Sequence, residues 1–375
     1  MKISFPHMGI SYIAFKHLLE ELGYEVIVPP NPTKRTLTYG VKYAPEFACM
    51  PFKILLGNYI EVLEKGAEIL ITSGGVGPCR AGLYGVVHEK ILKDIGYEFS
   101  MIVLEPPLEN FRDFSKRVLV LKQKGIRWTS FLHEVKNAWM KLKLLDKVEQ
   151  TVNKVRAREL NKGQTTKVFN EVLKMIDEAR SREEIFKVQK EAIDLLNSVP
   201  QDFSREPLKV GIIGEIYVVL EPHVNFDIER FLGERDVYVD RSIYITDYVR
   251  FAVWDKKGED HIKKAAQPYL KQMIGGHGIQ SVGETVLYAL NGYDGVIQLA
   301  PFTCIPEIVS KSILAKVSRD LDIPVLTINI DEQTGEAGVQ TRLEAFIDLI
   351  KQKKYAKEHA KEKEKGRLYE SVYGY

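Results

Sequence analysis

Three cysteines stand in three similar loops of this chain, and it has no others. Cys49, Cys79 and Cys304 each lie just past an apolar, strand-like run or at the mouth of a helix, among Gly and Pro residues. Three thiols in such loops indicate one shared soft ligand, an iron–sulfur cluster or another metal centre. Zinc with three thiolates and a fourth ligand, three unrelated buried cysteines, and a redox or nucleophilic thiol stay open as alternatives.

The cysteines follow the pattern of ligand sites in parallel sheets. Cys79 comes after the strand predicted over residues 68–72 and Cys304 after the strand predicted over 295–299. Ligands gather at the carboxyl ends of such strands. Cys49 precedes a predicted helix that starts at Pro51, whose amides and dipole favour a thiolate. Cys304 is far from the other two in sequence, unlike a compact ferredoxin or zinc knuckle, so the spacing predicts a site between two domains.

Other residues near these loops have side chains that could take part in chemistry. Glu46 and Glu307 lie three residues from Cys49 and Cys304, where they could supply a proton or stabilise a helix N-terminus. His277 stands between glycines, in a loop that lets the side chain reach a ligand as a proton donor.

Arg80 directly follows Cys79, and we read it as either a donor beside the ligand or a surface arginine. Gly77 precedes Cys79, where a glycine allows close backbone approach to a cluster. His7 follows the first strand at the same expected edge. Residues 211–215 resemble half a dinucleotide-binding loop but lack its third glycine.

The order of predicted elements divides the chain into four parts. Residues 1–110 alternate strands and helices as βαβ units do, 111–205 are helical, 206–350 return to the α/β pattern, and 351–375 form a charged, partly disordered tail. The predicted strands are 2–5, 25–28, 68–72, 99–104, 208–214, 236–239, 295–299 and 324–329. The predicted helices include 11–22, 51–66, 84–95, 131–144, 147–161, 166–179, 224–233, 282–291, 305–321 and 340–353.

Composition narrows the class of protein. The chain has 375 residues, a net charge of +2, 45% hydrophobic residues and 28% charged residues, which is ordinary for a globular protein. This balance predicts no nucleic-acid partner and no attraction to a membrane surface. We expect neither a signal peptide nor a membrane span. An odd number of cysteines favours a reducing cytoplasm.

Eight segments together resemble one known group of proteins, the 2-hydroxyacyl-CoA dehydratase / benzoyl-CoA reductase component superfamily. The closest likeness is to its acyl-CoA dehydratase activase-related branch, also labelled "CoA protein activase". The segments are residues 48–53, 57–61, 74–80, 275–278, 281–284, 301–307, 331–338 and 341–346.

The resemblance implies two flavodoxin-like (Rossmann-like) parallel-sheet domains with a helical middle region. It implies a [4Fe-4S] cluster on Cys49, Cys79 and Cys304, and an oxygen-sensitive protein that receives low-potential electrons from an ATP-dependent activator of the sugar-kinase/actin-like fold. The chain itself has no P-loop. A homologous subunit in a homodimer or heterodimer is a further expected partner.

The activity is expected to be reduction or dehydration of an acyl-CoA or another small substrate. Whether the chain is itself an enzyme stays open, because no CoA-binding motif is found in the sequence. The alternatives are a non-catalytic electron-transfer or scaffold subunit, and a zinc-binding structural protein.

Overall fold

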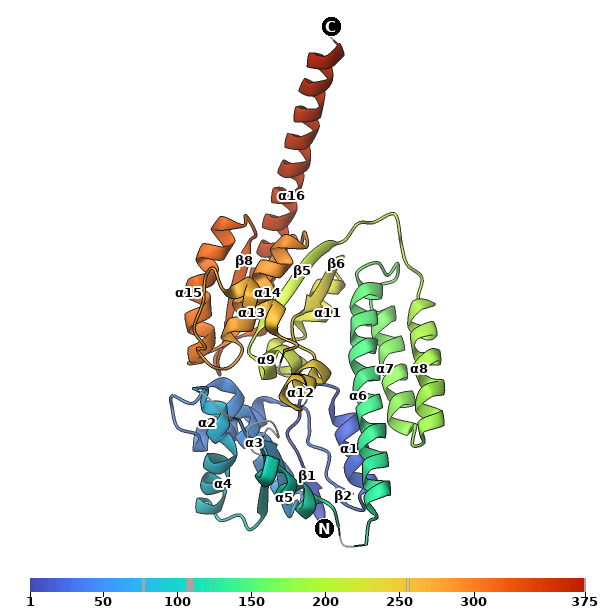
Figure 1. The fold of residues 1–375 in the computed structure, drawn as a ribbon, viewed down its shortest axis with the longest axis vertical. Helices are drawn as coiled ribbons and strands as arrows, with labels where there is room; N and C mark the ends of the chain where they lie inside the picture. Colours follow the sequence, from blue (N-terminus) through green and yellow to red (C-terminus); the bar gives the residue numbers. More distant parts are fainter. Residues whose placement is uncertain (76–77, 106–110, 124, 254, 256, 374–375) are drawn as a thin grey trace.

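The computed structural model describes residues 1–75, 78–105, 111–123, 125–253, 255 and 257–373. Two α/β lobes lie one above the other, and a layer of helices runs along one side of both (Figure 1). Each lobe has a four-stranded, all-parallel sheet, in the order β2-β1-β3-β4 in the first lobe and β6-β5-β7-β8 in the second. The predicted α/β fold with two parallel sheets is thereby confirmed.

The first lobe extends to residue 105. Its strands are β1 (Lys2–Ser4), β2 (Glu25–Val26), β3 (Ile69–Ser73) and β4 (Ser100–Leu104). Its helices are α1 (Tyr12–Glu21), α2 (Lys34–Tyr43), α3 (Met50–Glu64), the 3-10 helix η1 (Arg80–Leu83) and α4 (Tyr84–Asp94). Helix α2 was not predicted; it starts with a capping box formed by Thr33 and Thr36.

Helix α5 (Phe111–Leu121) packs against β4 of the first lobe, and the helical layer consists of α6 (Trp128–Arg156), α7 (Gln164–Glu178) and α8 (Arg182–Asn197). The predicted division into helices 131–144 and 147–161 is wrong, because α6 is continuous across it. No Gly or Pro interrupts residues 128–156, so nothing in the sequence stops the helix there. Ser181 begins α8 with a capping box, paired with Glu184.

The second lobe repeats the sheet order of the first. Its strands are β5 (Leu208–Gly214), β6 (Val237–Arg241), β7 (Gly295–Pro301) and β8 (Val325–Ile330). Its helices are α9 (Ile216–Leu220), α10 (Pro222–Asn225), α11 (Ile228–Gly233), α12 (Ile245–Val253), α13 (Asp260–Ala266), α14 (Gly278–Leu290), α15 (Ile305–Asp320) and α16 (Glu336–Tyr373). The sequence predicted a partly disordered tail from residue 351, but the backbone there continues α16, which projects from the lobe (Figure 1).

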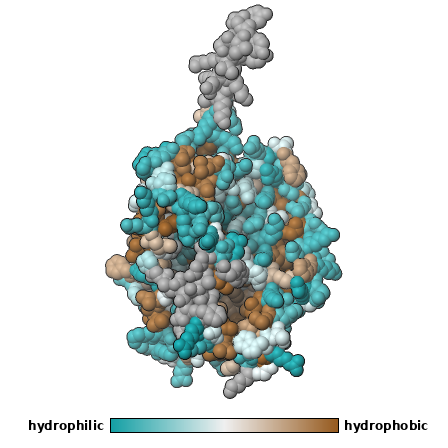
Figure 2. Space-filling model, viewed as in Figure 1, coloured by the Kyte–Doolittle hydropathy of each residue, from teal (hydrophilic) through white to brown (hydrophobic). Residues whose placement is uncertain are grey.

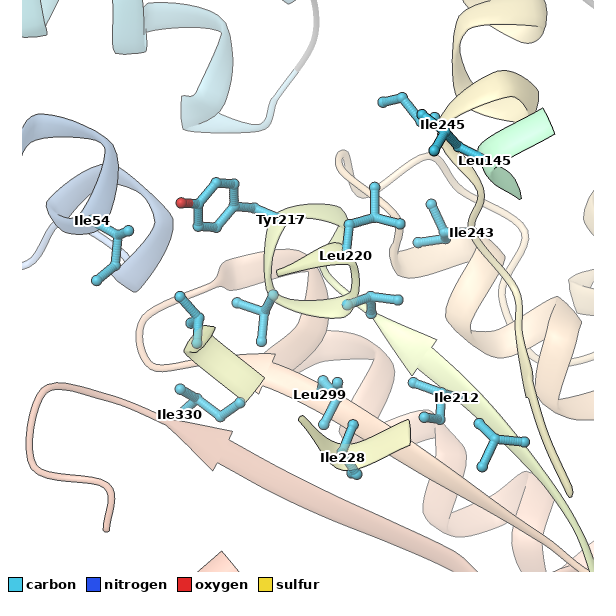
Figure 3. Packing of buried hydrophobic residues seen from close by; sticks show 14 of the residues in the cluster. Ile54, Leu145, Ile212, Tyr217, Leu220, Ile228, Ile243, Ile245, Leu299 and Ile330 are labelled. Carbon is cyan, nitrogen blue, oxygen red and sulfur yellow. The ribbon is translucent and has the colours of Figure 1, made fainter. Parts of the chain in front are cut away.

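One apolar core joins the lobes to the helical layer. Figure 3 shows Ile54 of α3, Leu145 of α6 and Leu220 of α9 in the same buried cluster. On the face seen in Figure 2, hydrophilic and hydrophobic residues are interspersed. In the described part of the chain, no helix is both long and apolar enough to cross a membrane.

Candidate functional site

Each cysteine is the residue that immediately precedes a helix. Cys49 precedes α3, Cys79 precedes η1 and Cys304 precedes α15, and all three have extended backbone angles. Cys49 and Cys304 are buried, whereas Cys79 is partly exposed. Proline follows both buried cysteines in the first turn of the helix, where its missing N–H is not needed. The short Gly/Pro loops therefore hold each thiol at a helix N-terminus.

Arg80 ties the three cysteine loops together. Its guanidinium donates hydrogen bonds of 2.8 Å to the carbonyl of Phe47 and 2.6 Å to the carbonyl of Thr303. The Thr303 hydroxyl also donates to the Phe47 carbonyl, at 3.2 Å. Of the two predicted roles, the side chain is exposed as a surface arginine would be, yet it bonds main chain from both lobes.

A cavity of about 390 Å³ lies between the lobes beside these loops. Its wall includes Met8 after β1, Gly74 after β3, Glu215 after β5 and Cys304 after β7. Strands β1 and β3 are neighbours, as are β5 and β7. From the first strand of each pair the chain continues toward one edge of the sheet, and from the second strand it continues toward the other edge. These are the topological switch points, where ligands bind in open α/β sheets. The two switch points thus share one cavity.

The thiols approach this cavity from different directions. Cys79 and Cys304 line it directly. Cys49 lies behind Tyr84, whose hydroxyl is hydrogen-bonded to the Cys49 sulfur and whose side chain also lines the cavity. The three sulfur donors therefore lie at or next to one space, contributed by both lobes.

Burial controls the protonation of the two inner thiols. Burial raises the pKa of Cys49, and nearby Glu215 raises it further, whereas the Tyr84 hydroxyl and Arg80 lower it. Burial also raises the pKa of Cys304 strongly, again with a contribution from Glu215. Both are neutral thiols at pH 7 in the free chain, so a metal that binds them displaces their protons.

Two glycines bring His277 into the cavity. Gly275 and Gly276 have positive φ angles of 84° and 49°. A Cβ on Gly275 would lie 2.9 Å from the Cys79 nitrogen, and one on Gly276 would lie 3.1 Å from Pro306. Only glycine allows this close approach of the second lobe to the Cys79 loop. His277 follows and lines the cavity, where burial lowers its pKa to about 4, so its ring is neutral at pH 7.

The two predicted carboxylates lie outside the cavity wall. Glu307 is fully buried and accepts hydrogen bonds from Ser281, Gln298 and Ser310, and its burial raises its pKa. Glu46 is exposed on the Cys49 loop. Neither is among the described residues that line the cavity. Gly77 lies outside the described residues.

Glu215 is a cavity residue that the sequence did not single out. It caps α9 by accepting a 3.1 Å hydrogen bond from the Val218 amide. Burial raises its pKa to about 7, against the opposing effect of the Val218 and Tyr217 amides. The available signal was its place directly after a buried strand and Gly214, in the segment read as half a dinucleotide loop.

The three thiols are soft donors, but their side chains do not converge on one point. Among the described residues, no three His, Cys, Asp or Glu side chains are grouped closely enough to hold one metal ion. One zinc ion would need its sulfur ligands at about 2.3 Å each. A cluster needs less convergence, because each thiolate binds a different iron. Three soft thiol donors around a cavity fit such a group in chemistry.

Comparison with known protein families finds a match in the first lobe. Residues 7–72 match the family described as CoA enzyme activase uncharacterised domain (DUF2229). The match begins after β1, ends within β3 and includes Cys49. It confirms the predicted resemblance to the CoA-activase-related branch of the 2-hydroxyacyl-CoA dehydratase superfamily. No curated protein sequence matches the chain.

Proposed function

We propose that this protein holds a [4Fe-4S] cluster on Cys49, Cys79 and Cys304 and accepts low-potential electrons through it. The observation that carries the proposal is the placement of three thiols from both lobes around the cavity shared by the two switch points. The match to a CoA enzyme activase domain supports the same family of chemistry. A cluster of this kind transfers single electrons, and an iron without a cysteine ligand can bind a small substrate.

The residues of the chain would support such a group in distinct ways. Arg80 holds the three loops in register. The Tyr84 hydroxyl donates to the Cys49 sulfur, which stabilises a thiolate there. His277 and Glu215 face the same cavity and could carry a proton to a bound substrate.

The electron donor in this proposal is an ATP-dependent activator of the sugar-kinase/actin-like fold. The substrate is reduced or dehydrated in the cavity, in a reducing, oxygen-poor cytoplasm. A second copy of the chain or a homologous subunit completes the assembly.

The test is anaerobic purification of the full chain followed by metal analysis and electron paramagnetic resonance. We expect about four irons per chain and the signal of a reduced [4Fe-4S] cluster. Cys79→Ala should remove most of the iron. Ser73→Ala, a change in the same cavity wall that removes no thiol, should keep it.

Two outcomes would overturn parts of the proposal. Colourless protein with one zinc per chain, or full iron content in Cys79→Ala, contradicts the cluster and its ligands. A cluster that is reduced by the activator and ATP but never turns over a substrate contradicts the catalytic role and leaves an electron-transfer subunit.

A further inference from the structure

The wall of the cavity between the lobes has carboxylates but no lysine or arginine among its described residues. Glu215 lies on it without an ion-pair partner among the described residues, and Glu259 lies on it paired with Lys263 at 3.3 Å. None of the described residues that line the cavity is Lys or Arg. Arg80, the nearby cation, is turned to the loop carbonyls. Burial makes the ionised form of Glu215 costly and raises its pKa to about 7, and a cationic ligand would favour the ionised carboxylate.

Aromatic rings make up much of the rest of the wall. Tyr84, Tyr217, Tyr248 and Phe251 all line the cavity. Ring faces attract organic cations, especially where water is excluded. A hydrated metal ion gains little from such rings, so they favour an ammonium group on a carbon skeleton.

Size narrows the class of ligand further. About 390 Å³ lies at the small end of the ~300–1,000 Å³ range of ligand pockets. A compact molecule fits this space, whereas the phosphates of a CoA thioester would find no cation on the described wall.

We propose that the cavity between the lobes binds a small organic cation, whose ammonium group lies at the Glu215 carboxylate beside the aromatic rings of the wall. This inference names the substrate class of the proposed redox site and so rests on that proposal. Three thiolates around a cluster would add further negative charge to the cavity and strengthen its preference for a cationic ligand.

The test compares three probes of one shape, n-butylammonium, n-butanol and butyrate, by calorimetric titration of the anaerobically purified full chain. We expect n-butylammonium to bind at least about tenfold more tightly than n-butanol, a preference the size of one partly buried charge interaction. Butyrate should not bind. Equal or tighter binding of butyrate would overturn the proposal.

Variants locate the site. Glu215→Gln keeps an acceptor for the Val218 amide, so it should lower n-butylammonium affinity about tenfold and leave n-butanol affinity unchanged. Glu98→Gln, an exposed carboxylate away from the cavity, should change neither. If Glu215→Gln leaves the preference for n-butylammonium intact, the cation lies elsewhere and the inference fails.

Iron content measured on the same samples separates the two proposals. A chain without iron that still prefers n-butylammonium contradicts the cluster and supports the cation site. A chain with a full cluster and no charge preference contradicts the cation site alone.

Discussion

Arg80 in the first lobe donates a 2.6 Å hydrogen bond to the carbonyl of Thr303 in the second lobe, 223 residues away in sequence. Thr303 has a positive φ of 63° and directly precedes Cys304. Because Arg80 directly follows Cys79, this one contact fixes the loop of one cysteine against the loop of another. The same guanidinium reaches the Phe47 carbonyl, in the loop of the third.

Arg80→Met should loosen the cysteine loops. It keeps an unbranched apolar side chain but removes two hydrogen bonds, at a cost of about 1 kcal/mol in the free energy of unfolding at this exposed site. Urea unfolding measures this change, and iron analysis should show lower occupancy. Arg319→Met, at an exposed position on α15, is the matched control. If Arg80→Met kept wild-type stability and iron content, the hydrogen bonds of Arg80 would have no role in holding the cysteine loops together.

The pairs that Glu221 forms with two histidines should make the stability of the protein depend on pH. The Glu221 carboxylate lies 2.6 Å from His7 of the first lobe and 3.0 Å from His223. Burial opposes ionisation, but hydrogen bonds from His223, His7 and the Gly9 amide outweigh it and lower its pKa to about 2. The hydrogen bond with Glu221 raises the pKa of His223.

The His223–Glu221 pair is therefore strongest at mildly acidic pH. The Glu221 contribution is complete above its usual pKa of 4.5 and is lost as pH falls toward 2. The His223 contribution is complete below its usual pKa of 6.5 and is lost as pH rises through the raised value. We expect His223→Asn to reduce the free energy of unfolding by about 0.5–1 kcal/mol more at pH 5.5 than at pH 8.5, because solvent screens this half-exposed pair. Chemical denaturation at both pH values measures these losses, with the exposed His133→Asn as control. Equal losses of unfolding free energy at the two pH values would contradict a stabilising His223–Glu221 pair.

Gly9 should tolerate no larger residue. Its φ is 52°, and a Cβ there would lie 2.3 Å from the Leu220 carbonyl oxygen of the second lobe. Gly66 has a similar positive φ of 88° but nothing within 4 Å of such a Cβ. Gly66→Ala thus measures backbone strain alone, and Gly9→Ala should cost about 1–3 kcal/mol more, because the added methyl group collides with the other lobe. Equal losses in thermal or urea unfolding would mean that the lobes yield freely at this point.

Tyr84 should tune the proposed cluster. Its hydroxyl is hydrogen-bonded to the Cys49 sulfur and would donate to it once Cys49 is a thiolate ligand, and hydrogen bonds to ligand sulfurs stabilise the more negative, reduced state. Tyr84→Phe should therefore make the midpoint potential more negative at unchanged iron content, in a redox titration followed by electron paramagnetic resonance. Tyr97→Phe lies outside the cavity wall and should leave the potential unchanged. An unaltered potential in Tyr84→Phe would mean that Cys49 is not a ligand.

Local sequence signals predicted the frame of this protein well. Apolar runs that end in Gly or Pro marked the strands. Each cysteine directly precedes a helix, Cys79 and Cys304 in loops that follow strands and Cys49 in the loop between α2 and α3. Two predictions about helices failed where the local sequence signals were weak. Helix α2 depends on the Thr33 capping box, and α6 continues where a break was predicted.

The chemistry of the site depended on distant partners. The bonding of Arg80 depends on carbonyls 33 and 223 residues away. The raised pKa of Glu215 comes from burial between two lobes. Neither property is present in any local stretch of sequence, because both arise only when the two sheets face each other.

Helix α6 runs along both lobes and contacts each of them. Its 29 residues span about 43 Å. Glu134 near its start lies 3.5 Å from His17 of the first lobe, and Glu149 near its end pairs with Arg241 of the second. Any change in the distance between the lobes would therefore strain the contacts that α6 makes with both of them.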